Sequence, residues 1–116
     1  MKIKFKLLKE GIKKPTLNKS NGLDIYLAED IVVPPFNTVL VKTGLSCKIP
    51  KHHSLLFCNH SNNFFHNINV STTNFDTSYK SEICLPLVNN TSQVIKLGGG
   101  TKISQALCIT SKIDIV

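Results

Sequence analysis

The chain opens on a regular alternation of polar and apolar residues. Residues 1–7 read Met-Lys-Ile-Lys-Phe-Lys-Leu. In a β-strand every second side chain points to the same face, so we expect Ile3, Phe5 and Leu7 to point inward and the lysines outward. Lysine also interrupts the apolar run at every second place, which is not the pattern of a signal peptide. We therefore expect a soluble protein whose first element is a strand.

Short apolar runs continue along the chain, and turn-forming residues separate them. Pro15 and several polar residues in 11–21 predict a linker. Proline, glycine and asparagine clusters then bound the runs, as expected for strands joined by turns. The predicted strands cover residues 23–27, 31–33, 38–41, 55–58, 83–88, 93–97 and 103–107. No segment has the pattern of a substantial helix, so the sequence predicts an all-β protein, and its 116 residues predict one domain over 1–116.

The segment from Ser71 to Glu82 carries the first candidate chemistry. Val70 ends an apolar run, polar residues follow, and Phe75 begins another run, which predicts a hairpin. A buried carboxylate at Asp76, three residues before Tyr79, could hold a water or a ribose hydroxyl while the ring packs against a sugar. The structural alternative is an aspartate that caps its own turn.

Lysine supplies all fourteen positive charges, because the sequence contains no arginine, and the formal net charge is +7. Such a surface attracts polyanions. Base readout, however, uses arginine forks or interleaved aromatic residues, and neither is present. We therefore expect a solvated basic surface and no nucleic-acid partner.

The cysteines and histidines show no metal-binding pattern. The four cysteines lie among apolar neighbours without a Cys-x-x-Cys pair, which predicts buried free thiols in a reducing compartment, the cytoplasm or the nucleus. All four histidines fall within residues 51–66, around one of the cysteines, but their spacing forms no repeated ligand doublet and argues against zinc. These residues are Cys47, Cys58, Cys84 and Cys108, and His52, His53, His60 and His66.

Several segments occur in a familiar order. Gly22-Leu23-Asp24-Ile25 is followed by His60-Ser61-Asn62, then by residues 73–82, and finally by Gly100-Thr101-Lys102-Ile103-Ser104-Gln105. Over residues 15–109 the chain resembles the trimeric dUTPase family, which carries Ala-Gly-x-Asp-Leu, Arg-Ser-Ser, Gly-x-Ile-Asp-x-x-Tyr-Arg-Gly-Glu and Gly-Asp-Arg-Ile-Ala-Gln-Leu in these places. The resemblance implies a distorted β-barrel or jelly roll of the β-clip type and a homotrimer.

The resemblance also implies roles for individual residues in the hydrolysis of dUTP to dUMP and pyrophosphate. Asp24 would hold Mg²⁺ through water, and Asp76 would orient the attacking water at the α-phosphate. The ring of Tyr79 would lie under the deoxyribose. The remaining candidate nucleotide-binding residues are Ser61, Lys80 and Gln105.

Departures from the family pattern lead to two hypotheses for function. His60 stands where the family has a phosphate-binding arginine, and a neutral imidazole lacks the five-donor guanidinium fork. Ser71 and Thr73 replace glycines that let the backbone approach uracil, and Lys80 and Lys102 replace arginines. The first hypothesis is a degraded nucleotide site in a non-catalytic protein, which acts through trimer assembly or protein–protein contacts. The alternative is an active Mg²⁺-dependent dUTP diphosphatase in which lysines substitute for arginine.

The last residues add two expectations. The sequence ends before the family's final glycine-rich segment, so we expect the lid that this segment forms over the nucleotide to be absent. The apolar tail Asp114-Ile115-Val116 could also add as a strand to a PDZ-type groove of a protein partner.

Overall fold

The computed structural model describes residues 2–19, 22–60, 67–110 and 115, and these ranges contain twelve strands and no helix. The prediction of an all-β protein is confirmed. None of the described residues belongs to a helix that is long and apolar enough to cross a membrane.

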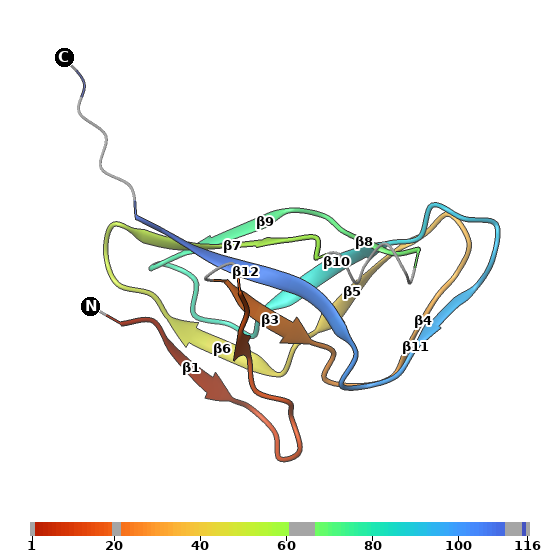
Figure 1. Ribbon diagram of the computed structural model, residues 1–116, viewed down its shortest axis with the longest axis horizontal. Helices are drawn as coiled ribbons and strands as arrows, with labels where there is room; N and C mark the ends of the chain where they lie inside the picture. Colours follow the sequence, from red (N-terminus) through yellow and green to blue (C-terminus); the bar gives the residue numbers. More distant parts are fainter. Residues whose placement is uncertain (1, 20–21, 61–66, 111–114, 116) are drawn as a thin grey trace.

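The largest sheet has five strands. They are β2 (Thr16–Leu17), β3 (Leu23–Tyr26), β12 (Lys102–Thr110), β7 (His53–Cys58) and β9 (Thr73–Asp76), in that order across the sheet. All four pairs are antiparallel, and β12 runs through the middle as the longest strand (Figure 1). Gln105 on β12 lies opposite Asp24 on β3 and opposite Cys58 on β7. This register brings segments together that are about 80 residues apart in the sequence.

The other strands form three smaller sheets. One contains β5 (Thr38–Lys42), β10 (Cys84–Val88) and β8 (Asn69–Val70). The second pairs β1 (Lys4–Leu7) with β6 (Leu45–Lys48), and the third pairs β4 (Ile31–Val33) with β11 (Ile95–Leu97). Figure 1 shows β1 and β6 at one end of the molecule and β4 and β11 at the other.

Alternation along the strands builds the core. On β7, Leu55 and Phe57 are buried, whereas Leu56 and Cys58 between and after them are only half-buried. The Phe57 and Phe75 rings meet edge to face with centroids 5.4 Å apart, a favourable arrangement of two aromatic rings. The five-stranded sheet therefore has an inner face that carries Phe57 and Phe75, and an outer face that carries Asp24, Cys58 and Gln105.

The first segment folds as its pattern predicts. Lys4 and Lys6 are exposed, whereas Phe5 and Leu7 are half-buried and pack against the core. The segment 11–21 was expected to be a linker, but its residues 16–17 form β2, which pairs with β3. A two-residue strand has no alternation long enough to be detected in a sequence.

The predicted hairpin between Val70 and Phe75 is wrong. β8 pairs with β10, whereas β9 pairs with β7, so the two strands belong to different sheets. Ser71 donates its backbone N–H to the Pro86 carbonyl at 3.0 Å and thus still follows β10. The chain crosses from one sheet to the other between Ser71 and Thr73 instead of turning back on itself.

The cysteines are free in the structure. The expectation that they are buried holds for Cys47 only, since Cys58 and Cys84 are half-buried and Cys108 is exposed. Residues 108–110 are all exposed, because this end of β12 lies outside the core. Cys108 shares that exposure.

Candidate functional site

A polar hollow of about 700 Å³ opens beside β3 and β12. We call it the Asp24 hollow; its lining is Leu17, Asn18, Lys19, Asp24, His60, Lys102 and Gln105. Three of these, Asp24, His60 and Gln105, come from separate segments that the family resemblance singles out. The fold therefore brings together residues that the resemblance places at the magnesium ion and the phosphates of the nucleotide.

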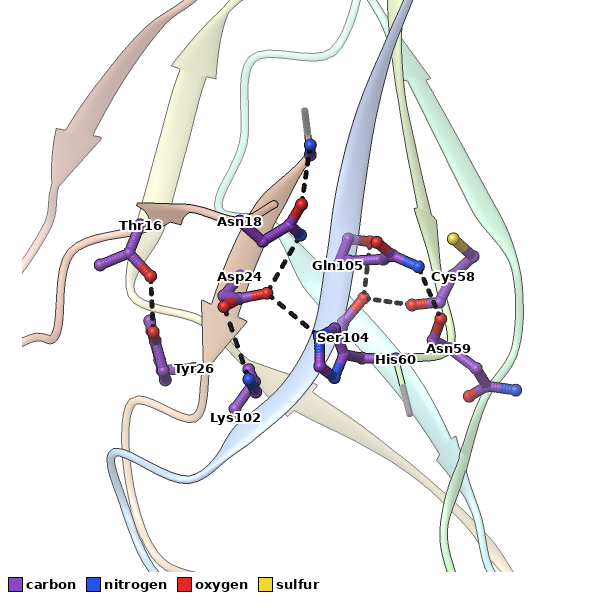
Figure 2. A network of polar contacts seen from close by, with 11 residues as sticks. Thr16, Asn18, Asp24, Tyr26, Cys58, Asn59, His60, Lys102, Ser104 and Gln105 are labelled. Atoms are coloured by element: carbon purple, nitrogen blue, oxygen red, sulfur yellow. Dashed lines mark hydrogen bonds and ion pairs between the residues drawn. The ribbon is translucent and has the colours of Figure 1, made fainter. Parts of the chain in front are cut away.

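Asp24 is the centre of the hollow, and three donors surround its carboxylate (Figure 2). Asn18 donates through Nδ2 to Oδ1 at 3.2 Å, and His60 Nε2 lies 3.5 Å from the same oxygen. Lys102 Nζ lies 3.5 Å from the other oxygen, Oδ2. The Asp24 side chain is 13% exposed, and it lines the hollow.

Local features of three strands hold these side chains in place. The β3–β12 register shifts between Lys102 and Ser104, and such a bulge re-aims the side chains next to it. Ser104 donates its hydroxyl to the Cys58 carbonyl at 3.0 Å. Gln105 donates its side-chain Nε2 to the Asn59 carbonyl at 3.1 Å. The amide of Gln105 is therefore held at the edge of the hollow by the end of β7.

A tight reversal before β3 presents Asn18. The Asn18 N–H donates to the Gly22 carbonyl at 2.9 Å, and the Gly22 N–H donates back to Asn18 Oδ1 at 3.0 Å. A Cβ atom on residue 22 would lie 2.9 Å from Leu107 Cδ2 and 3.2 Å from the Ala106 carbonyl oxygen. Glycine is therefore needed here because the chain passes close to β12.

The Asp24 hollow suits a magnesium ion that is held largely by water and substrate. Mg²⁺ prefers oxygen ligands, keeps several waters and binds through one or two carboxylates together with phosphates. Asp24 supplies one such carboxylate at the hollow, and Lys102 and His60 beside it suit phosphate oxygens. The residues present therefore fit an ion bridged by water to Asp24.

Asp76 ends β9 at the surface, and the expectation of a buried carboxylate is wrong. Its Oδ1 accepts hydrogen bonds from the Ser78 N–H at 2.9 Å and from the Ser78 hydroxyl. This is the turn-capping aspartate of the structural alternative. The hydroxyl of Ser78, followed by its N–H, holds the pKa of Asp76 below its ordinary value. Asp76 is therefore a carboxylate at neutral pH.

Substituting Ser78→Ala is expected to raise the pKa of Asp76 toward the ordinary value of 3.8, since the hydroxyl is the largest cause of the lowering. A carboxyl with a lowered pKa favours the folded state above its unfolded-state pKa, and that contribution is lost as the pH falls through the folded-state value. A ¹³C NMR titration of the Asp76 carboxyl carbon measures the shift. Ser81→Ala, at an exposed serine three residues later, is the matched control, and equal titration curves for all three proteins would contradict the assignment.

Tyr79 is fixed against the core rather than free at the surface. Its ring centroid lies 4.5 Å from that of Phe75, which in turn contacts Phe57. Its hydroxyl donates to the Glu82 carbonyl at 2.5 Å, and burial raises the pKa of this phenol. Glu82 accepts the Gly44 N–H through Oε2 at 2.9 Å. The ring is thus a rigid, partly exposed surface beside Asp76.

The structure does not bring Asp76 and Tyr79 to the Asp24 hollow. Three strand-to-strand steps separate β9 from β3, and Asp76 lies opposite Ser54 on β7, whereas Asp24 is level with Cys58. From ordinary strand spacings the two carboxylates are roughly 20 Å apart. They lie on the same, outer face of the sheet. One chain therefore holds the candidate residues in two separate places, around Asp24 and around Asp76, which we call the half-sites.

The remaining candidates divide between these places. Gln105 lines the Asp24 hollow, whereas Lys80 is exposed beyond the Asp76 turn. Ser61 and His66 lie outside the described residues. Among the residues that are described, no group of three or more histidine, cysteine or acidic side chains could hold a metal ion.

Asn18 lines the Asp24 hollow and contacts Asp24, and sequence reasoning missed it as a candidate site residue. The contacts of His60 and Lys102 with Asp24 were also not foreseen, although both residues were noted as replacements of arginine. Asparagine is a common turn residue, and the Asn18 to Gly22 spacing was the only available signal for the reversal.

The structure is therefore an all-β jelly roll with a carboxylate-centred, cation-lined hollow beside its largest sheet. The dUTPase family model matches residues 10–115. The chain belongs to the dUTPase family.

Curated relatives and solved structures agree with this assignment. The chain is 31% identical over 108 residues to the deoxyuridine 5'-triphosphate nucleotidohydrolase of Clostridium tetani, covering 89% of this chain and 74% of that protein. It is 32% identical over 110 residues to the same enzyme of Treponema denticola, covering 89% and 76%.

Two phage proteins show the same fold. The dUTPase of the Staphylococcus aureus phage phi11 matches with a TM-score of 0.88 at 17% identity, covering 100% of this chain and 94% of that one. The dUTPase of Staphylococcus bacteriophage 80alpha gives a TM-score of 0.88 at 17% identity, covering 99% and 94%. The jelly-roll fold expected from the sequence is confirmed.

Proposed function

We propose that this protein is a Mg²⁺-dependent dUTP diphosphatase that releases dUMP and pyrophosphate. The observation that carries this proposal is the Asp24 hollow, which His60, Lys102 and Gln105 line together with one carboxylate. These residues come from different segments, and each occupies a position that the family uses at the triphosphate. The relatives from Clostridium tetani and Treponema denticola are named for this activity.

In the proposed reaction the two half-sites take different parts of the nucleotide. Lys102, His60 and Gln105 bind phosphate oxygens at the Asp24 hollow, and bound magnesium would offset the negative charge of the triphosphate. Asp76 accepts a proton from water as the water attacks the α-phosphorus. The bond from that phosphorus to the bridging oxygen breaks, and pyrophosphate leaves. Asp76 suits this role because it is exposed and because both of its hydrogen bonds from Ser78 go to the same oxygen, Oδ1.

Because the half-sites are roughly 20 Å apart on one chain, we propose that one nucleotide reaches both only when they come from different subunits. The outer face of the five-stranded sheet supports an assembly. Leu56 and Leu107 lie opposite each other between the half-sites, and Ile109 beside them is 39% exposed. A homotrimer, the assembly implied by the family, would bury this apolar strip and join Asp24 of one subunit to Asp76 of the next.

A non-catalytic protein remains the alternative, and two side chains favour it. His60 offers at most two donors where the family has an arginine. Thr73 is half-buried on β9, where the family has a glycine, and its hydroxyl bonds to the Ser71 carbonyl at 2.9 Å. In this alternative the trimer acts through assembly or a protein partner. The proposed PDZ contact stays a prediction, since Asp114 and Val116 lie outside the described residues and Ile115 is 94% exposed.

Pyrophosphate release from dUTP in Mg²⁺, with a parallel thermal-shift titration of the non-hydrolysable analogue dUpNHpp, tests the proposal. We expect turnover of dUTP that exceeds turnover of UTP and dCTP by at least about tenfold, with a higher KM than an arginine clamp would give. Stabilisation by dUpNHpp without turnover would support the non-catalytic alternative. If dUTP is not turned over and dUpNHpp does not stabilise the protein, assembly is the remaining function.

A further inference from the structure

A second hollow, of about 390 Å³, lies beside the β1–β6 pair and has a very different lining. We call it the lysine hollow. It contains Lys2, Lys4, Lys48, Lys80, Thr77 and residues 49–50, and it shares no residue with the Asp24 hollow. Of the residues that the structure describes, four lysines and no acidic side chain line this concave surface. This hollow therefore has a strongly positive potential.

Strand register forces two of the charges together. Lys4 on β1 lies directly opposite Lys48 on β6, so their side chains share one face of the pair. Like charges directly opposite each other destabilise an antiparallel pair. Lys2 precedes Lys4 by two residues, a spacing that keeps a side chain on the same face of an extended chain. The β1–β6 edge thus carries repulsion that no described carboxylate offsets through an ion pair.

Lys80 joins this edge from the Asp76 turn. Burial raises the pKa of the Cys47 thiol on β6, and the charge of Lys80 partly offsets that rise. Lys80 lines the same hollow as Lys48 of β6, although it is exposed to solvent. Thr77 adds a hydroxyl donor from the same turn, and Ile49 and Pro50 give the lysine stems an apolar wall.

We propose that the lysine hollow binds an oligophosphate, a run of linked phosphate groups, at a site separate from the Asp24 hollow. Lysine binds phosphate as a compact point charge, and four such charges suit a multivalent anion better than a single carboxylate. A bound oligophosphate relieves the repulsion between Lys4 and Lys48. The linked phosphates come either from a free oligophosphate or from a single-stranded nucleic-acid backbone. No base readout is involved, because the hollow has no aromatic side chain.

The test is calorimetric titration of the full chain with inorganic tripolyphosphate, without Mg²⁺ and at low salt. The double variant Lys4→Gln/Lys48→Gln is expected to bind about tenfold more weakly, because it removes two charges next to the anion. The matched control is Lys9→Gln/Lys96→Gln, which replaces two exposed lysines outside the hollow. It has the same net charge as Lys4→Gln/Lys48→Gln. This control is expected to bind within about twofold of the wild type, since distant charges are screened.

Three further arms complete the design. Lys102→Gln removes a phosphate-binding cation from the Asp24 hollow and is expected to leave the tripolyphosphate binding that depends on Lys4 and Lys48, so failure of this proposal is distinguishable from failure of the proposed dUTP hydrolysis. Thermal melts without ligand are expected to show Lys4→Gln/Lys48→Gln at least as stable as the wild type, because a repulsion is removed. A parallel titration with an oligothymidylate distinguishes a single-stranded nucleic-acid backbone from a free oligophosphate as the source of the linked phosphates. Equal weakening in both double variants, or binding lost only in Lys102→Gln, would overturn the proposal.

Discussion

Asp76→Asn is expected to lower dUTP turnover by about two to four orders of magnitude, the usual contribution of a positioned general base. Asparagine has nearly the same shape, and its Oδ1 can still accept the two hydrogen bonds from Ser78. It cannot take a proton from water at neutral pH. The chemical step therefore fails while the turn persists. Pyrophosphate release at saturating dUTP measures the loss.

The control for this variant separates charge from chemistry. Glu10→Gln removes one exposed carboxylate in the turn after β1, so it changes the net charge equally. We expect it to keep wild-type turnover. The melting temperature of Glu10→Gln should match the wild type, whereas Asp76→Asn loses the contribution to folding that the lowered pKa of Asp76 indicates. Wild-type turnover in Asp76→Asn would remove Asp76 from the reaction.

How far the sequence predicted this fold depended on how local the determining forces are. Burial alternates within a strand, so the faces of β1 could be predicted from the lysines and Phe5 alone. Pairing, in contrast, depends on residues far away in the chain. Nothing between Val70 and Phe75 indicates that β8 pairs with β10 while β9 pairs with β7. The hairpin prediction failed because strand partners are a tertiary property.

The candidate site residues also divide into those that the sequence predicts and those that depend on tertiary structure. Asp24 and Gln105 could be predicted from ordered segments, and the β3–β12 register places them opposite each other. The exposure of Asp76 could not be predicted, because the burial of a turn depends on which other segments of the chain cover it. The contact of Lys102 with Asp24 follows from a bulge in β12 that single-sequence patterns do not reveal.

Because the half-sites are separate on one chain, the turnover of trimers mixed from Asp24 and Asp76 variants tests whether the half-sites meet across subunits. Asp24→Asn and Asp76→Asn are each expected to be inactive alone. In a trimer whose sites join Asp24 of one subunit to Asp76 of the next, random 1:1 mixing leaves both carboxylates intact in about a quarter of the sites. Co-refolding the two variants should therefore restore about a quarter of wild-type turnover.

The design has an internal control for nonspecific recovery. Mixing Asp24→Asn with the double variant Asp24→Asn/Asp76→Asn produces hybrids that never pair two intact carboxylates, so it should stay inactive. Native mass spectrometry establishes that hybrid trimers have formed. Hybrids without recovered turnover would mean that Asp24 and Asp76 do not meet across subunits. Because the two carboxylates are roughly 20 Å apart within one chain, one dUTP would then not be shared between them.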